Sequence, residues 1–176
     1  MMKRFVPTYY VKHCTQIDFT MLKNQGINLV LFDVDNTLVA HKSQVVEDRV
    51  KKMIGEVYHL GMTPLLISNN TQKRVEKIAK ELKIESFSFA CKPSKRRYKQ
   101  IIKKYDCKPQ EIVAIGDQLI TDVYGANRMG IKSILQDPLA EKENTAGKAT
   151  RRLENKIWKR LLEKGWLKKG EYYHEM

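Results

Sequence analysis

Two aspartates, Asp33 and Asp35, end an apolar stretch and are separated by a single valine. The stretch 29–33 has the length of a buried strand, and where a strand ends its alternating side-chain directions relax, so both carboxylates can approach one point. Two carboxylates this close repel each other unless a cation lies between them, which favours a hard metal ion such as Mg²⁺. An ordinary strand followed by an Asp-Asn turn has the same composition and is the structural alternative.

Three further apolar runs also end in polar residues. Ser68 and Asn69 follow the run that begins at Pro64, Lys92 follows the run 87–90, and Asp117 follows the run 112–115. Each ending alone is more typical of a helix cap or a turn. Parallel strands, however, bring their carboxyl ends to one edge of a sheet, where ligands bind in open α/β proteins, so we expect the four endings to meet there.

The rest of the pattern predicts the elements that would position these residues. Apolar runs alternate with amphipathic stretches of helical periodicity, which indicates an α/β protein with βαβ units and a mostly parallel sheet of five strands. The N-terminal residues 1–14 are expected to form a loop or a short extended arm, and Thr15 to cap a helix that ends at Gly26. The expected strands are 29–33, 64–68, 87–90, 112–115 and 131–135, and the later helices are 45–60, 71–82, 94–105, 119–129 and 145–168.

Composition restricts the class of protein. The 176 residues suit one globular domain, 1–176, with a motif-bearing core at about 28–136 and a C-terminal helix at about 145–168. The net charge of +13 predicts an acidic partner, such as a phosphorylated substrate, an anionic lipid surface or nucleic acid. No run is apolar enough for a membrane span or a signal peptide, so we expect a cytoplasmic protein without a transmembrane segment. Its three cysteines lack metal-ligand spacing and are expected to be reduced thiols.

The four polar endings resemble the motifs of the haloacid dehalogenase (HAD) superfamily of phosphatases. The residues from Asp33 to Thr37 match the motif DxDxT, Ser68 ends the second motif, Lys92-Pro93 matches the third, and Gly116-Asp117 with Asp122 matches GDxxxxD. More narrowly, the strings DVDNTL, SNN, KP and GDQLxTDVxGAN resemble the YqeG group of HAD subfamily IIIA, which is similar to the mitochondrial phosphatidylglycerophosphatases. The resemblance covers about residues 28–136 and implies a single-domain, three-layer Rossmann-like fold.

The resemblance also implies roles for the reacting groups. Asp33 would attack phosphorus and form an aspartyl-phosphate, and Asp35 would act as general acid and then general base. Mg²⁺ would be held by Asp33, the backbone carbonyl of Asp35 and Asp117. Asp122 would orient a metal-bound water or Lys92.

The remaining residues of the motifs would bind the phosphate. Ser68 and Asn69 would donate hydrogen bonds to its oxygens, and Lys92 would place a positive charge beside them. Only one helix fits between successive motifs, so a capless enzyme with an open site for a bulky substrate is expected.

Two basic segments bear on the substrate. Residues 92–104 contain no acidic residue and could draw an anionic membrane towards the site, or could simply be a solvated helix face. The tail helix 145–168 could lie on a membrane or pack its apolar side on the sheet, and packing is favoured. These features predict an Mg²⁺-dependent phosphatase of phosphatidylglycerophosphate or a similar anionic phosphomonoester, peripheral on the inner face of the membrane.

Two alternatives stay open. The same catalytic groups could hydrolyse a soluble protein, nucleotide or sugar phosphate. A basic RNA- or ribosome-binding module on an HAD scaffold is disfavoured, because the catalytic set is complete and no aromatic residues interleave with the basic runs. Nothing in the sequence fixes the oligomeric state.

Overall fold

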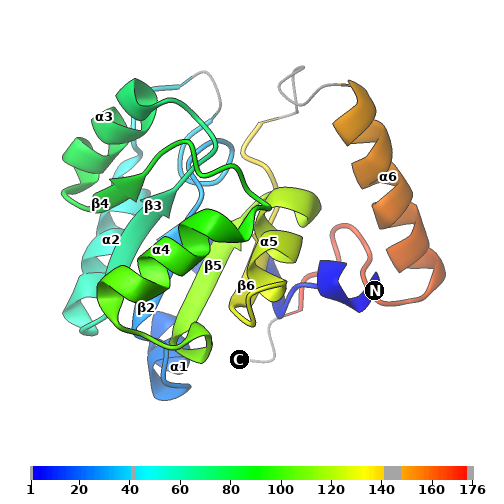
Figure 1. Ribbon diagram of the computed structural model, residues 1–176, viewed down its shortest axis with the longest axis horizontal. Coiled ribbons are helices and arrows are strands. Elements are labelled where there is room, and N and C mark those ends of the chain that lie inside the picture. The colour runs from blue at the N-terminus through cyan, green and yellow to red at the C-terminus, as the bar shows by residue number, and fades with distance from the viewer. Residues whose placement is uncertain (1, 41–42, 141–147, 174–176) are drawn as a thin grey trace.

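The fold is built on a single six-stranded parallel sheet (Figure 1). The computed structural model describes residues 2–40, 43–140 and 148–173. The strands lie in the spatial order β1-β6-β5-β2-β3-β4, and every neighbouring pair is parallel. Their bounds are β1 (Tyr9–Val11), β2 (Leu29–Phe32), β3 (Thr63–Ile67), β4 (Glu85–Phe87), β5 (Ile112–Gly116) and β6 (Lys132–Gln136).

The predicted strand count of five was too low by one. The N-terminal segment, which we expected to be a loop or an extended arm, forms β1 and pairs with β6 in the register Tyr10 to Leu135. A strand of three residues is too short to show the alternation by which a strand is recognised in sequence, so its sheet partner decides the conformation.

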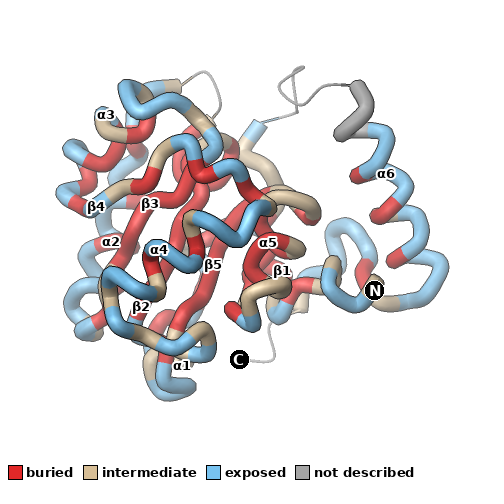
Figure 2. The backbone as a smooth tube through the Cα atoms, viewed as in Figure 1, coloured by how far each residue is buried: buried red, intermediate tan, exposed pale blue. Residues whose placement is uncertain are grey.

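Helices cover both faces of the sheet, which gives three layers (Figures 1 and 2). Along β2 the side chains alternate: Val30 and Phe32 belong to the core under one set of helices, and Leu29 and Leu31 belong to the core under the other. The first face is covered by α1 (Phe19–Asn24), α2 (Asp48–His59) and α3 (Gln72–Leu82), and the second by α4 (Lys95–Tyr105) and α5 (Tyr124–Asn127). The predicted three-layer α/β fold is thus confirmed.

The last helix, α6 (Lys148–Glu163), packs against β1 and β6 at the end of the sheet away from α2 and α3 (Figure 1). Ile157 and Leu161 are buried in a cluster with Tyr10 of β1 and Leu135 of β6, so the predicted packing of this helix is confirmed. Two other leucines of the same helix, Leu153 and Leu162, are exposed. The predicted start at 145–147 lies outside the described residues, and the helix ends at Glu163 rather than 168. Among the helices described, none has the length and apolarity to cross a bilayer.

Two other predicted elements were placed wrongly. The third strand is Glu85–Phe87 rather than 87–90, because the amides of Phe89 and Ala90 donate to the carbonyls of Asn70 and Ser68 instead of extending the sheet. The first helix is capped by Asp18, whose Oδ1 accepts from the Met21 amide at 2.9 Å, and not by Thr15, which lies in a short 3₁₀ turn.

The order of the strands creates the site. From β2 the chain proceeds through β3 to β4 on one side, and β5 and β6 lie on the other, so the direction of winding reverses between β2 and β5. A crevice opens at such a switch point outside the carboxyl ends of the strands. Asp33 directly follows β2, and Asp117 directly follows β5.

Candidate active site

Asp33 is fixed at the end of β2 by backbone and side-chain contacts. Its amide donates to the carbonyl of Ile115 at 2.9 Å, which continues the pairing of β2 with β5. Its Oδ2 accepts a long hydrogen bond of 3.4 Å from the Thr37 hydroxyl. The residue is only 7% exposed, so its carboxylate is largely shielded from solvent.

Lys92 joins Asp33 to Asp122 in a buried triad. Its Nζ donates to Asp33 Oδ1 and to Asp122 Oδ1, both at 2.6 Å. The other oxygen of Asp122 accepts from the Gln118 amide at 3.1 Å and from the Thr121 hydroxyl at 3.3 Å. Both oxygens of Asp122 are therefore engaged with protein donors, and the geometry makes Asp122 the anchor of the Lys92 side chain.

Burial and charge act against each other on these groups. Burial raises the pKa of Asp33 to about 6, although the adjacent Lys92 ammonium opposes the rise. For Lys92 burial disfavours the charge, but the carboxylates of Asp122 and Asp33 outweigh it and raise the pKa of the ammonium. Lys92 is therefore charged at neutral pH and available to stabilise a phosphate.

Asp122 reaches the triad because of the local backbone. The segment predicted as one helix over 119–129 is a π-helical turn, Leu119–Val123, followed by α5. Gly116 lies against it: a Cβ at this position would come within 2.6 Å of the Asp122 Cβ. The glycine of the motif is thus required for close approach of Asp122 to the end of β5.

Asp35 points into a different set of contacts. Arg74 of α3 donates to Asp35 Oδ1 from Nε at 2.7 Å and pairs with it through Nη2 at 2.6 Å. Asn70 donates to the other oxygen, Oδ2, at 2.9 Å. The third guanidinium nitrogen of Arg74, Nη1, donates to the Ser43 carbonyl at 3.0 Å, so the arginine itself is held in place. The two contacts fix the direction of the Asp35 carboxylate.

The second and third polar endings are tied to each other. Asn69 Nδ2 donates to the Lys92 carbonyl at 3.0 Å, and its Oδ1 accepts from the Lys92 amide at 2.6 Å. Ser68 is buried, and its Oγ accepts from the Asn70 amide at 3.2 Å while its hydrogen can still be donated to a ligand. The side chain of Asn69 therefore positions the backbone of Lys92, whereas Ser68 has the donor that a phosphate oxygen needs.

The carboxylates can be tested against the expected metal ion. Asp33, Asp117 and Asp122 each place one oxygen within 4.8 Å of the others. Oxygen atoms from carboxylates are the donors that Mg²⁺ prefers, and it completes its octahedron with waters and substrate phosphate oxygens. Because both oxygens of Asp122 already accept from protein donors, Asp33 and Asp117 are the carboxylates that would hold the ion, and their oxygens fit Mg²⁺.

All the site residues expected from the sequence thus lie at the carboxyl edge of the sheet, but the sequence did not identify Asn70 and Arg74 as partners of Asp35. No sequence signal distinguishes Arg74: a cation in the first turn of a helix is opposed by the helix dipole, but Lys73 and the first residues of α4 are basic as well.

Comparison with known proteins identifies the family. Residues 1–140 match the family model described as mitochondrial PGP phosphatase. The chain is 31% identical over 163 residues to a probable phosphatase YqeG of Bacillus subtilis, covering 93% of this chain and 95% of the relative. It is 28% identical over 174 residues to the chloroplastic/mitochondrial phosphatidylglycerophosphate phosphatase 1 of Arabidopsis thaliana, where 93% of this chain covers 50% of the relative.

Solved structures support the fold. The chain superposes with a TM-score of 0.50 and 16% identity on the 3-deoxy-D-manno-octulosonate 8-phosphate phosphatase of Moraxella catarrhalis, covering 84% of this chain and 97% of that one. That structure contains a magnesium ion and a phosphate ion. With the family match over residues 1–140 and the HAD motifs assembled at one sheet edge, the chain belongs to the mitochondrial PGP phosphatase family and is a phosphatase of the HAD superfamily.

Proposed function

We propose that this phosphatase removes the terminal phosphate of phosphatidylglycerophosphate, or of a similar anionic lipid phosphomonoester, in an Mg²⁺-dependent reaction at a membrane surface. The observation that carries the proposal is the position of Asp33, a buried carboxylate at the switch point whose Oδ1 lies 2.6 Å from the Lys92 ammonium. The substrate follows from the matched family and from the similarity to the Arabidopsis enzyme.

The reaction proceeds in two displacements on the chain's own carboxylates. An oxygen of Asp33 attacks phosphorus, the bond from phosphorus to the leaving alcohol breaks, and Asp35 gives its proton to the departing alkoxide. Water then attacks the aspartyl-phosphate, Asp35 takes a proton from it, and inorganic phosphate leaves as the Asp33 carboxylate is restored. Arg74 and Asn70 hold the Asp35 carboxylate in one direction for both transfers.

Other groups would balance the charge of the transferred phosphoryl group. Mg²⁺, held by Asp33, the Asp35 carbonyl and Asp117, would neutralise negative charge on the phosphoryl oxygens. Lys92 supplies a fixed positive charge beside the phosphoryl oxygens. Asp122 orients its ammonium group, and Asn69 holds the Lys92 backbone. Ser68 donates its hydroxyl to a phosphoryl oxygen.

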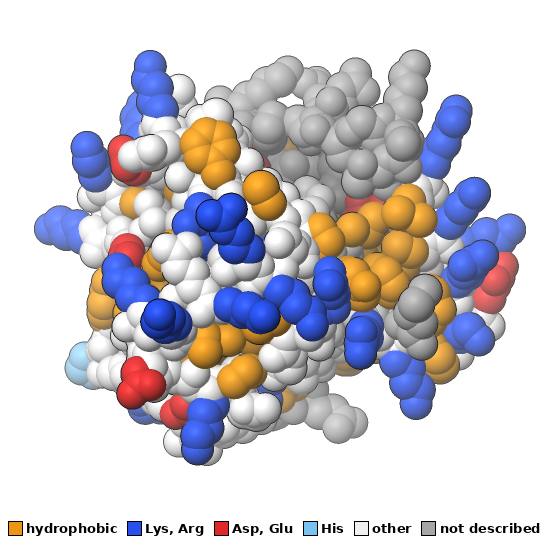
Figure 3. All heavy atoms as spheres, in the orientation of Figure 1, with side chains coloured by type: hydrophobic (Ala, Val, Ile, Leu, Met, Phe, Trp, Pro, Cys, Tyr) orange, Lys and Arg blue, Asp and Glu red, His pale blue; other side chains and the backbone are white. Residues whose placement is uncertain are grey.

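The charge of the front face supports a lipid surface as the place of reaction. Lys and Arg side chains gather over α4 (Figure 3), which follows Lys92 in the chain. Exposed basic residues of this helix include Arg96 and Lys99, and Phe89, which is 56% exposed, precedes it. A basic face with an exposed aromatic side chain suits the interface of an anionic membrane.

The direct test is phosphate release from phosphatidylglycerophosphate in mixed micelles, with Mg²⁺ and with EDTA. We expect turnover that depends on Mg²⁺ and is lost in Asp33→Asn, because the amide cannot form the aspartyl-phosphate. Asp48→Asn is the matched control, since that aspartate side chain is 91% exposed on α2 and should leave the rate unchanged. Turnover of soluble sugar, nucleotide and peptide phosphates with the lipid ignored would refute the proposed substrate.

A second experiment isolates the membrane. The double variant Arg96→Glu/Lys99→Glu should lower the rate on anionic vesicles, because each basic residue near such a surface contributes about 1 kcal/mol. Lys52→Glu/Lys80→Glu, on α2 and α3 of the opposite layer, changes the charge equally and should not lower it. An equal fall in both double variants would show that net charge, and not this face, matters.

A further inference from the structure

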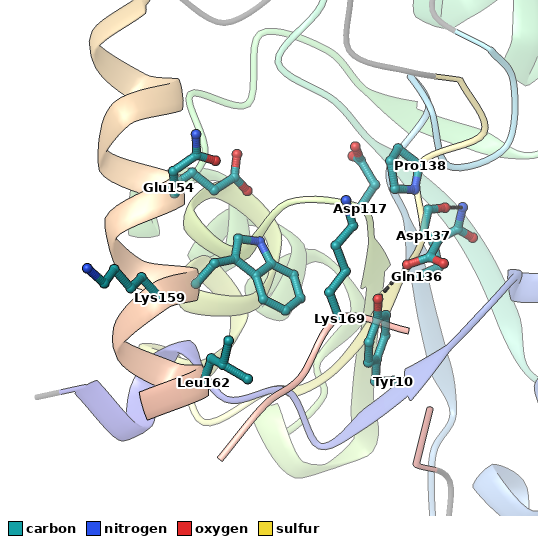
Figure 4. A pocket seen from close by; sticks show the side chains of 11 residues that line it. Tyr10, Asp117, Gln136, Asp137, Pro138, Glu154, Lys159, Leu162 and Lys169 are labelled. Atoms are coloured by element: carbon teal, nitrogen blue, oxygen red, sulfur yellow. Dashed lines mark hydrogen bonds between the residues drawn. The ribbon is translucent and has the colours of Figure 1, made fainter. Parts of the chain in front are cut away.

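A cavity of about 740 Å³ lies between α6 and the carboxyl edge of the sheet (Figure 4). This volume lies within the range of small-molecule sites, about 300–1,000 Å³. Its walls combine residues from both ends of the chain with the loops that follow β5 and β6, and the ones that the argument uses are Tyr10, Asp117, Trp158, Leu162 and Lys169.

The cavity is continuous with the active site. Asp117 lines it, and one oxygen of Asp117 lies within 4.8 Å of an Asp33 oxygen. A phosphoryl group bound at Asp33 therefore has the cavity beside it. The leaving group, which extends away from that phosphoryl group, needs a space in this position.

Two of the cavity's carboxylates are held by the protein itself. Asp137 accepts hydrogen bonds of 2.5 Å from the hydroxyls of Tyr10 and Tyr172. Glu154 accepts from the Leu119 amide at 3.1 Å, which joins α6 to the turn after β5. In these contacts the carboxylates accept hydrogen bonds from groups of the protein, so their negative charge is directed at protein donors.

Lys169, in contrast to these carboxylates, directs its charged group into the cavity. Its side chain extends into the cavity on the side of Asp117, whereas Lys159 on α6 points outwards (Figure 4). Across the space from Lys169, Leu162 is directed into the cavity, and Trp158 is half-buried with its ring 6.2 Å from that of Tyr10. The cavity thus presents one cation and one apolar wall, both next to the candidate phosphoryl site.

We infer that this cavity binds a leaving group that carries a second phosphate: Lys169 pairs with that phosphate, and Trp158 and Leu162 contact the apolar part attached to it. The inference rests on the proposed function and deepens it, because phosphatidylglycerophosphate has such a second, diester phosphate between the glycerol that carries the reacting group and the acylated glycerol.

Binding can be tested without catalysis. Dihexanoyl-phosphatidylglycerol, a short-chain phosphodiester that keeps its acyl groups and is soluble below its micelle concentration, is titrated into the ¹⁵N-labelled protein, and the two indole N–H signals are followed. The signal of Trp158 should shift and that of Trp166, which does not line the cavity, should stay in place. Lys169→Ala should raise the dissociation constant about tenfold, as expected for loss of a charge-assisted hydrogen bond. Lys169→Arg should restore it, and Lys168→Ala, the exposed neighbour, should have no effect.

The kinetic arm compares substrates with one and two phosphates. With the deacylated substrate glycerophosphoglycerol phosphate, Lys169→Ala should raise KM about tenfold and leave kcat unchanged. With glycerol 3-phosphate, which lacks the second phosphate, the variant should behave as wild type. Phosphatidylglycerophosphate in micelles, run in parallel, distinguishes the lipid from its soluble head group as the natural source of the phosphate.

The two arms separate two failures. If wild type hydrolyses none of the substrates, the proposed function is wrong, and the titration alone decides the role of the cavity. If wild type is active but Trp158 does not respond to the phosphodiester, or Lys169→Ala affects both substrates equally, the cavity is not the leaving-group site and the inference is overturned.

Discussion

Replacing Lys92 by Met would remove the one ammonium between two buried carboxylates and keep the length of the side chain. The Lys92 side chain is 2% exposed, and those of Asp33 and Asp122 are 10% and 5% exposed. Removing one partner of a buried pair typically destabilises a protein by about 3–5 kcal/mol, because the remaining charge is left uncompensated. We therefore expect the free energy of unfolding of Lys92→Met to fall by about 3–5 kcal/mol at neutral pH.

The assay is urea unfolding in EDTA, so that no metal ion compensates the carboxylates. Adding Asp122→Asn to Lys92→Met removes one of the two repelling charges and should recover part of the lost stability. It should not recover activity, since the rate loss of about 10²–10³ comes from the missing charge beside the phosphoryl group. Lys95→Met, at an exposed position three residues further on, is the control and should change stability by less than about 0.5 kcal/mol.

The reasoning would be refuted if Lys92→Met were as stable as wild type in EDTA. It would also fail if the double variant were less stable than the single one, because the two carboxylates would then not be the source of the cost.

Three further predictions follow from contacts in and around the site. Arg74→Ala should lower kcat on alkyl phosphates about 10²-fold, because Asp35 loses the side chain that orients its carboxylate. The first turnover of p-nitrophenyl phosphate should change far less, because its leaving group needs no proton. The control is Arg49→Ala, which removes an exposed ion pair with a glutamate. Gly116→Ala should destabilise by about 1–3 kcal/mol through its clash with the Asp122 side chain. Gly55→Ala, with nothing near its Cβ in α2, should instead stabilise the helix by up to about 1 kcal/mol, and urea unfolding measures both. Added Mg²⁺ should raise the melting temperature of wild type in calorimetry and raise that of Asp117→Ala much less, because an ion that binds only the folded state stabilises it by mass action.

The fold was predictable because its strong signals agree. The five predicted strands alternate with amphipathic helices, and the central ones are apolar on both faces, as buried parallel strands are. Ile112–Gly116 and Leu29–Phe32 are buried along their whole lengths, so the apolar runs marked them well. Glu85–Phe87 was misplaced because Glu85 is exposed at the sheet edge, and the more apolar residues after Phe87 turn back to bond the loop after β3.

The site was predictable where the residues follow strands and unpredictable where they come from helices. Asp33, Ser68, Lys92 and Asp117 each come soon after a strand, and parallel pairing alone brings such residues together. The approach of Arg74 to Asp35 depends on where α3 begins and on the rotamer of a long side chain, neither of which the sequence pattern specifies. The cavity under α6 depends on packing between residues more than a hundred positions apart, which periodicity along the chain does not encode.

The pairing of Tyr10 with Tyr173 bears on the order in which the active site and its cavity are completed. The Tyr10 amide donates to the Tyr173 carbonyl at 2.8 Å, and the Tyr173 amide donates back at 3.0 Å. Tyr10 is synthesised well before its sheet partner on β6 and its bridge partner Tyr173. Contacts of such sequence separation form slowly, because a long loop must close before they contribute. Tyr10 is also a wall of the cavity beside Asp117, so a nascent chain could assemble the buried triad of Asp33, Lys92 and Asp122 while this wall was still missing.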